Sequence, residues 1–237
     1  MGTDTEPGRP SSECYDAVIF DLGGVVLPSP FDAWAHYEHD LGLAVGTIRG
    51  VVAASGGDGA WAQHERGELA FEEFVAAFEA ECLAAGAPEV SALEVMNRLA
   101  SGSSPRPEML AAISVIRGAG LKTAALTNNW AAPALNVGGV EGHDDRPVVE
   151  LARWFDVIVE SAVEGIRKPD PLIYEIVCER IAVEPSRAVF LDDLGVNLKP
   201  ARAMGMTTIK VTQPAAALVE LGNVLGLSLT STISPAR

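Results

Sequence analysis

Short apolar runs, each followed by polar residues, recur along the chain. Three such runs are 17–20, which is followed by Asp21, 124–126 at the end of an expected strand at 122–126, which is followed by Thr127 and Asn128, and 188–191, which is followed by Asp192 and Asp193. Buried strands of a parallel sheet have this composition, and ligands bind outside the carboxyl ends of such strands. The pattern therefore predicts several strands whose polar ends meet at one edge of a sheet.

Helical periodicity fills the intervals between these runs. The expected helices are 108–117, 171–181, 200–204 and one that begins at Pro214, and two further strands are expected at 156–159 and 207–211. Asp170 is the expected N-cap of the second helix, with Pro171 at its first position. Strands that alternate with helices indicate βαβ units, so we predict an α/β fold with a Rossmann-like parallel sheet.

Residues 31–104 interrupt this alternation. Strand signals are missing there, and helical spacing places one set of apolar residues on a common face: Phe71, Phe74, Val75, Phe78 and Cys82. Weaker helix patterns cover 31–41 and 91–99. The predicted organisation is a disordered tail at 1–13, an α/β core at 14–30 and 105–237 with a loop at 131–146, and a helical insert at 31–104.

The composition narrows the range of partners. The chain has 237 residues, 48% of them hydrophobic, and a net charge of −15 with only 17 Lys and Arg. No basic cluster occurs, which disfavours nucleic acids and anionic membrane surfaces. No apolar run is long enough to span a membrane, the first residues lack the apolar segment of a signal peptide, and the three cysteines are widely spaced. We therefore expect a soluble cytoplasmic protein.

The carboxylates at the strand ends predict a metal site. If Asp21, Asp192 and Asp193 converge, their like charges raise one another's pKa unless a cation neutralises them. All three offer hard oxygen ligands, and no His or Cys lies at a matching spacing, so Mg²⁺ is the expected cation. A backbone carbonyl of the turn at Gly23, water and a substrate phosphate would complete its shell.

Hydrogen-bond donors at the same edge predict a phosphate site. The Thr127 hydroxyl and the backbone NH groups around Asn128 can bind phosphate oxygens, and Lys168 adds a positive charge from a loop. Asp21 could then attack phosphorus, which would form an aspartyl-phosphate that water later hydrolyses.

These segments resemble the four sequence motifs of the haloacid dehalogenase (HAD) superfamily. The matching segments are residues 20–25, 126–128, 167–170 and 190–193, and the insert is similar to the helical cap of subfamily I. The resemblance implies that Asp21 is the nucleophile, that Asp21, Asp193 and the Gly23 carbonyl bind Mg²⁺, and that Thr127, Asn128 and Lys168 hold phosphate.

A closer resemblance is to the N-terminal phosphatase domain of soluble epoxide hydrolases and to the related domain fused to some acyl-CoA dehydrogenases. It is carried by residues 126–130, 159–161 and 190–202 and covers nearly the whole chain, from 15 to 229. It implies a phosphatase that acts on a small phosphomonoester.

The chain departs from the family pattern at Gly23. Enzymes of this family usually have a second Asp, the general acid and base, two residues after the nucleophile. Glycine cannot transfer a proton, and general acid catalysis contributes roughly 10²- to 10⁴-fold. Leaving groups that depart without protonation, such as aryl or anomeric phosphates, would suffer least from this change.

Three hypotheses for the function therefore remain. The first is a slow or selective Mg²⁺-dependent phosphatase, the second a catalytically weak module that binds phospho-ligands or a partner, and the third a haloacid dehalogenase, which the Asp192-Asp193 pair disfavours. His64 or Arg66 in the insert could contact the leaving group, and Trp130 could line the pocket. The sequence identifies neither the substrate nor the oligomeric state.

Overall fold

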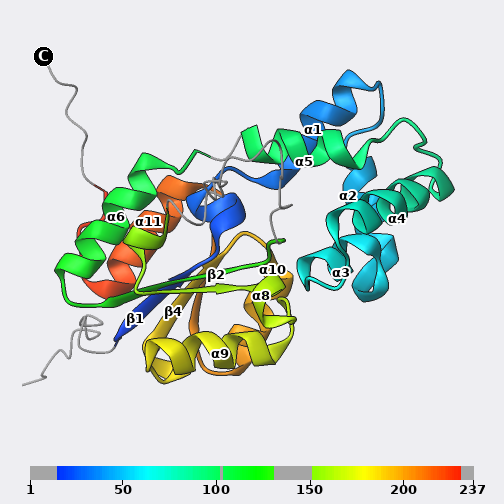
Figure 1. Ribbon diagram of the computed structural model, residues 1–237. Helices are drawn as coiled ribbons and strands as arrows, with labels where there is room; N and C mark the ends of the chain where they lie inside the picture. Colours follow the sequence, from blue (N-terminus) through cyan, green and yellow to red (C-terminus); the bar gives the residue numbers. More distant parts are fainter. Residues whose placement is uncertain (1–14, 102–103, 131–150, 231–237) are drawn as a thin grey trace, which may run out of the picture.

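The fold is known from a computed structural model, which describes residues 15–101, 104–130 and 151–230. Five parallel strands form one sheet in the order β3-β2-β1-β4-β5 (Figure 1). The strands are β1 (Ala17–Phe20), β2 (Lys122–Thr127), β3 (Val157–Glu160), β4 (Ala188–Asp192) and β5 (Thr207–Lys210). The predicted α/β class and parallel sheet are confirmed. The predicted tail at 1–13 and loop at 131–146 lie outside the described residues.

Helices cover both faces of the sheet, as Figure 1 shows. Val18 and Phe20 point to the side of α6 (Pro107–Gly118) and α11 (Pro214–Leu225). Ala17 and Ile19 point to the other side, where α9 (Pro171–Ile181) and α10 (Gly195–Ala203) pack. Because β1 is buried on both faces, all four of its residues are apolar. Its carboxyl end is thereby fixed in the middle of the sheet edge.

The segment between β1 and α6 is helical. Its elements are a single turn (Leu22–Val26), α1 (Pro30–Asp40), α2 (Thr47–Ser55), a 3-10 turn (Gly56–Asp58), α3 (Ala60–Glu65), α4 (Phe71–Ala84) and α5 (Ala92–Ser101). Helices α1 to α5 build their own apolar cluster, in which the Trp61 ring packs edge-on against Trp34, Phe74 and Phe78. We call α1 to α5 the cap. They lie beyond one end of the sheet (Figure 1), and their exact limits as a domain stay a prediction.

The remaining elements flank β3 and β4. They are α8 (Ser161–Glu164) and the 3-10 turns Ala152–Trp154 and Pro185–Arg187. The predicted helix at 200–204 is longer than expected, because α10 begins at Gly195 and contains Pro200 within it. The backbone NH of Leu194 and the side chain of Asn197 both bind Asp192, which fixes the start of this helix. The helices α2, α3 and α8 were not predicted, since they are short and adjoin glycines.

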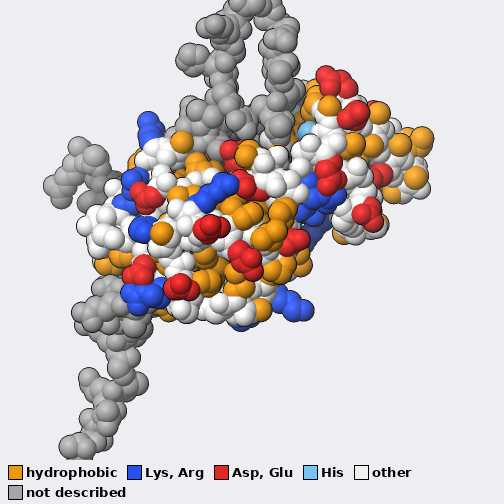
Figure 2. All heavy atoms as spheres, turned by 60° about the horizontal axis from the view of Figure 1, so that its bottom comes forward, with side chains coloured by type: hydrophobic (Ala, Val, Ile, Leu, Met, Phe, Trp, Pro, Cys, Tyr) orange, Lys and Arg blue, Asp and Glu red, His pale blue; other side chains and the backbone are white. Residues whose placement is uncertain are grey.

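Basic and acidic side chains are interspersed on the surface. Figure 2 shows one face of the molecule, where basic side chains occur in small groups among acidic and apolar ones. Within the part of the chain that the structure describes, no helix combines the length and apolar character needed to cross a bilayer.

Candidate active site

Asp21 lies at the carboxyl end of the central strand. Its backbone NH donates to the Leu191 carbonyl, so β4 fixes the chain at this point, and one carboxylate oxygen accepts a 2.6 Å hydrogen bond from the NH of Leu22. The chain then turns through Gly24, which has a φ of +75°. A Cβ at Gly24 would lie 2.4 Å from Oδ2 of Asp193, so only glycine lets the turn pass this close to the second carboxylate.

Lys168 joins the ends of β1 and β4. Its Nζ lies 2.9 Å from Oδ1 of Asp21 and 2.8 Å from Oδ2 of Asp192. The lysine side chain is 1% exposed, and Asp192 is completely buried. A buried ammonium needs partners of this kind, because removing a charge from water is costly. The three residues therefore form one ionic unit at the sheet edge.

Both carboxylate oxygens of Asp192 accept hydrogen bonds. Besides Lys168, it accepts bonds from the backbone NH of Leu194 at 2.8 Å and from the side-chain amide of Asn197 at 3.1 Å. Both of its oxygens are thus engaged by protein donors. Asp192 is therefore better suited to position Lys168 than to act as an exchangeable metal ligand.

The acidic cluster has the composition of a divalent cation site. Oxygens of Asp21, Asp192 and Asp193 all lie within 4.8 Å of one another. Three carboxylates and the single Lys168 ammonium leave two formal negative charges, which a divalent ion would neutralise. Carboxylate oxygens at this separation fit Mg²⁺. Asp21 and Asp193 have more free lone pairs than Asp192, and they are the better candidates for direct ligands.

Burial controls protonation in this cluster. It raises the pKa of Asp21, which the Lys168 charge opposes and the Asp192 charge increases further. Burial and the charge of Asp192 likewise raise the pKa of Asp193 to about 6, against the opposing effect of Lys168 and Arg49. The carboxylates thus repel one another, and a cation bound between them would favour their ionised forms.

Asn128 holds the lysine loop by a reciprocal pair of hydrogen bonds. Its Oδ1 accepts from the Lys168 backbone NH at 2.9 Å, and its Nδ2 donates to the Lys168 carbonyl at 3.0 Å. The side chain is therefore committed to Lys168, and only its backbone remains for the predicted phosphate contact. Thr127, at the end of β2, is buried, and among the described residues its hydroxyl makes only a long 3.5 Å contact, with the Asn128 carbonyl.

Comparison with known proteins identifies the family of this chain. A family model described as haloacid dehalogenase-like hydrolase matches residues 15–205. The chain belongs to this hydrolase family. The resemblance drawn from the four motifs is thereby confirmed.

The alignments with curated relatives extend over most of this chain. It is 39% identical over 217 residues to acyl-CoA dehydrogenase family member 10 of Mus musculus and 35% identical over 224 residues to bifunctional epoxide hydrolase 2 of Sus scrofa. Each match covers 91% of the chain, but only 20% and 40% of the respective relative. A sesquiterpene phosphatase of Aspergillus oryzae is 25% identical over 213 residues, with 90% of the chain and 97% of the relative covered.

A solved structure shares the fold of this hydrolase. It is a HAD family enzyme from Bacteroides thetaiotaomicron in complex with magnesium and inorganic phosphate, with a TM-score of 0.55 and 18% identity. The match covers 83% of this chain and 93% of the other.

The cap of the hydrolase contacts the core next to Lys168. Glu65 of α3 lies 2.7 Å from Arg167, and its other oxygen accepts a bond from the Trp61 indole at 3.0 Å. At Gly67, a Cβ would lie 2.7 Å from the Ala162 carbonyl, so the cap backbone touches α8 directly. The sequence analysis missed this contact, because Glu65 and Arg167 are far apart in the chain and each is ordinary in its own segment.

The structure shows the surroundings of His64, Arg66 and Trp130, which were expected to contact the leaving group or line the pocket. His64 is buried and stacks on Phe74 at 4.3 Å, and Trp130 packs against the cap cluster. The His64 ring donates from Nδ1 to the Leu69 carbonyl, and burial lowers its pKa. Arg66 pairs with Glu68 on the surface. Arg66 and Nδ1 of His64 are thus engaged within the cap, whereas the buried Nε2 of His64 has no hydrogen-bond partner among the described residues.

Asn197 is a further residue that the sequence analysis missed. It holds Asp192, as described above, and its own carbonyl accepts a bond from the buried Tyr174 hydroxyl at 2.7 Å. Its position five residues after Asp192, at the start of a helix, was the only available signal. Many asparagines have such positions without any contact to a preceding carboxylate.

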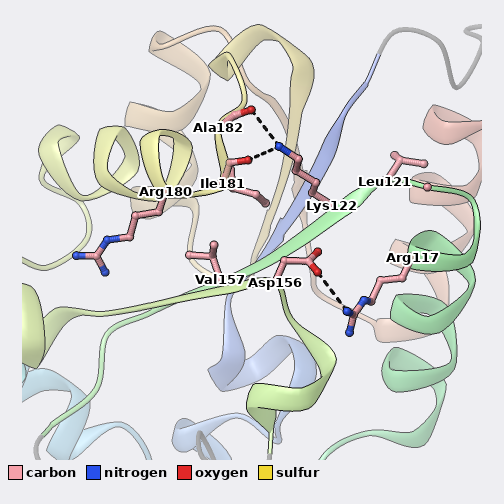
Figure 3. A pocket seen from close by; sticks show the side chains of 9 residues that line it. Arg117, Leu121, Lys122, Asp156, Val157, Arg180, Ile181 and Ala182 are labelled. Carbon is pink, nitrogen blue, oxygen red and sulfur yellow. Dashed lines mark hydrogen bonds and ion pairs between the residues drawn. The ribbon is translucent and has the colours of Figure 1, made fainter.

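An open pocket lies at the opposite end of the sheet (Figure 3). It adjoins the first residues of β2 and β3, and its cations are engaged: Lys122 binds the carbonyls at the end of α9, and Arg117 binds Asp156. The third, Arg180, pairs with Glu164. The pocket has no link to Asp21, so the candidate active site is the acidic edge beneath the cap.

Proposed function

We propose that this hydrolase is a Mg²⁺-dependent phosphatase that cleaves small phosphomonoesters through an aspartyl-phosphate on Asp21. The observation that carries the proposal is the buried Asp21 carboxylate, held between the Lys168 ammonium and Asp193 at the end of the central strand. This arrangement keeps a nucleophile beside a fixed positive charge. Phosphoryl transfer needs mainly positioning and neutralisation of charge.

In the proposed reaction, the residues have the following roles. Lys168, the Thr127 hydroxyl and the backbone NH groups near Asn128 hold the phosphoryl oxygens. An Asp21 oxygen forms a bond to phosphorus, and the bond from phosphorus to the leaving oxygen breaks with its electron pair on that oxygen. Water then attacks the phosphorus of the aspartyl-phosphate, which releases phosphate and restores Asp21.

The metal site fits this scheme. We assign Asp21, Asp193 and the Gly23 carbonyl as the ligands, with Asp192 positioning Lys168. A bound Mg²⁺ supplies positive charge to the phosphoryl oxygens and keeps both ligand carboxylates ionised.

The relatives support a phosphatase without identifying its substrate. One curated relative is a sesquiterpene phosphatase, and a structure of the same fold was solved with magnesium and inorganic phosphate. The chain spans less than half of the epoxide hydrolase and acyl-CoA dehydrogenase relatives, so their full activities do not transfer to it.

Gly23 favours a second candidate function. Without a proton donor at this position, the fold could bind phosphate esters and turn them over only weakly, as a phospho-ligand-binding or interaction module. Binding without hydrolysis would distinguish this candidate from the phosphatase.

The test compares the natural protein with Asp21→Asn, a variant of nearly the same shape that lacks the nucleophile. We expect Mg²⁺-dependent hydrolysis of p-nitrophenyl phosphate that drops by at least about 10³-fold in the variant, because covalent catalysis is lost. Equal rates over a broad panel of phosphate esters would refute the phosphatase. If phosphate esters then still raise the melting temperature, the binding module is favoured, and chloride release from a 2-haloacid would indicate a dehalogenase.

A further inference from the structure

An ion pair between the cap and the core lies directly beside Lys168. Oε2 of Glu65, on α3, is 2.7 Å from Nε of Arg167, the residue that precedes Lys168 in the chain. Both atoms are buried, and in the part of the chain that the structure describes neither forms a hydrogen bond elsewhere. Each atom therefore depends on the other, and removing one member of a buried pair is costly. The contact constrains Arg167 and, through the backbone, the segment that carries Lys168.

Glu65 also ties this contact to the interior of the cap. Its Oε1 accepts a 3.0 Å hydrogen bond from the indole of Trp61, whose ring lies in the apolar cluster of the cap. The Glu65 side chain is only 10% exposed, so water and salt weaken the ion pair less than they would a surface pair. The Trp61 ring also packs edge-on against Trp130, two residues after Asn128, with ring centres 6.0 Å apart. Helix α3 thus contacts both core segments that meet at the lysine.

The other contacts that hold Lys168 come from the core. Asn128 binds its backbone, and two carboxylates of the sheet edge bind its ammonium. The Arg167 carbonyl accepts a 2.9 Å hydrogen bond from the NH of Asp170, which closes a turn around Lys168. A shift of Arg167 therefore moves this turn as a unit. Among the ion pairs of the described residues, the one made by Glu65 alone joins the cap to the core.

We propose that Glu65 is a positioning residue of the phosphate site: through Arg167 it fixes the turn that carries Lys168, so that the ammonium is correctly placed for a phosphoryl group only while α3 is seated on the core. This inference rests on the proposed phosphatase function and deepens it, because it makes phosphate binding depend on the cap. The effect concerns the phosphoryl group, which all phosphate esters share. Loss of the contact should therefore weaken the enzyme to the same extent for every leaving group.

The test measures binding of inorganic phosphate in the presence of Mg²⁺, by titration calorimetry, in the natural protein, Glu65→Gln and Arg167→Gln. Glu65→Gln keeps an acceptor for the Trp61 indole and removes the charge that faces Arg167. We expect each variant to bind phosphate about 10-fold more weakly, and to lose about the same factor in kcat on p-nitrophenyl phosphate and on phenyl phosphate, because the ammonium is displaced. Arg167→Lys keeps a cation and should retain most of the affinity.

Glu38→Gln is the matched control for a general loss of cap packing. The Glu38 carboxylate is also buried in the cap, but it accepts hydrogen bonds from the backbone NH groups of Gly46 and Ile48, which belong to the cap as well. We expect this variant to melt at a lower temperature and to change the affinity for phosphate by less than about twofold. An equal loss of affinity in Glu38→Gln, or an unchanged affinity in Glu65→Gln, would overturn the inference.

The double variant Glu65→Gln with Arg167→Gln tests whether the two residues act through one contact. It should bind phosphate no more weakly than the weaker single variant, whereas additive losses would show separate roles and contradict the inference. Kinetic losses that differ between the two substrates would assign Glu65 to the leaving group instead. If the natural protein binds phosphate but is no faster than Asp21→Asn, the phosphatase proposal fails and the titrations still decide the role of Glu65. If it binds no phosphate, the positioning role is wrong as well.

Discussion

The Lys168 ammonium lies 2.9 Å from the Asp21 carboxylate, although the two residues come from different segments of the core. The contact is almost completely buried, and the same ammonium also binds Asp192. Lys168 thus sets the orientation of the nucleophile and offsets part of the repulsion within the acidic cluster.

Replacing Lys168 by Met should damage both stability and activity. The variant leaves two buried carboxylates without their cation, and breaking such a unit costs about 3–5 kcal/mol. Urea unfolding without divalent ions measures this loss, and the p-nitrophenyl phosphate assay should show a rate at least about 10²-fold lower. The double variant Lys168→Met with Asp192→Asn is the control: it should regain stability but not activity. A single variant as stable as the natural protein would contradict this account.

Replacing Asn128 by Ala should loosen the lysine loop. Both hydrogen bonds to the Lys168 backbone disappear, at about 1 kcal/mol each, and a displaced ammonium should lower kcat by about 10- to 100-fold. The neighbouring Asn129→Ala is the matched control, because the Asn129 side chain binds Glu160 instead. Equal kinetic effects of the two variants would show that Asn128 does not act through Lys168.

Introducing Asp at Gly23 should increase turnover. Gly23 has a φ of −62° and a ψ of 128°, which any residue can adopt, and its Cβ position makes only ordinary contact with Pro30. We expect about 10²-fold faster hydrolysis of phenyl phosphate in Gly23→Asp and no gain in Gly23→Ala, which adds bulk but no acid.

Replacing the adjacent Gly24 by Ala should have the opposite effect on activity to Gly23→Asp. Its positive φ and the 2.4 Å approach to Asp193 make the substitution disruptive, so activity should be lost. If Gly23→Asp folds normally and hydrolysis still does not increase, the missing proton donor is not what limits the rate.

His64 should make the protein less stable in acid. Burial lowers its pKa from 6.5, although the bond to the Leu69 carbonyl opposes the shift. The unfolded chain therefore binds a proton at this residue more readily than the folded protein, and the contribution of His64 to stability is lost as the pH falls below 6.5.

The measurement for His64 is the melting temperature of the natural protein and of His64→Phe at about pH 8 and about pH 5. Phenylalanine keeps the stacking on Phe74 but cannot be protonated. The fall in melting temperature between the two conditions should be smaller in the variant. An identical fall would assign the acid sensitivity to other groups, such as the carboxylates of the sheet edge.

The location of the candidate site was predictable, because it depends on local rules. Apolar runs that end at Asp21, Thr127 and Asp192 indicate parallel strands, and the ends of adjacent parallel strands necessarily meet. The α9 helix and its Asp170 cap were predictable for a similar reason, since capping involves neighbours in the sequence. In contrast, the start of α10 depends on Asp192, and Pro200 gave a misleading signal.

By itself, the sequence determined the fold class, the family and the set of polar residues at the sheet edge, because periodicity, turn residues and motif spacing are properties of short segments. Only the tertiary structure decided which atoms meet: Lys168 between Asp21 and Asp192, Asn128 on the Lys168 backbone, Glu65 against Arg167, and Arg49 on Phe31. These contacts join residues from different elements. Side-chain partners of this kind are set by how strands and helices pack, and each segment alone is compatible with many such arrangements.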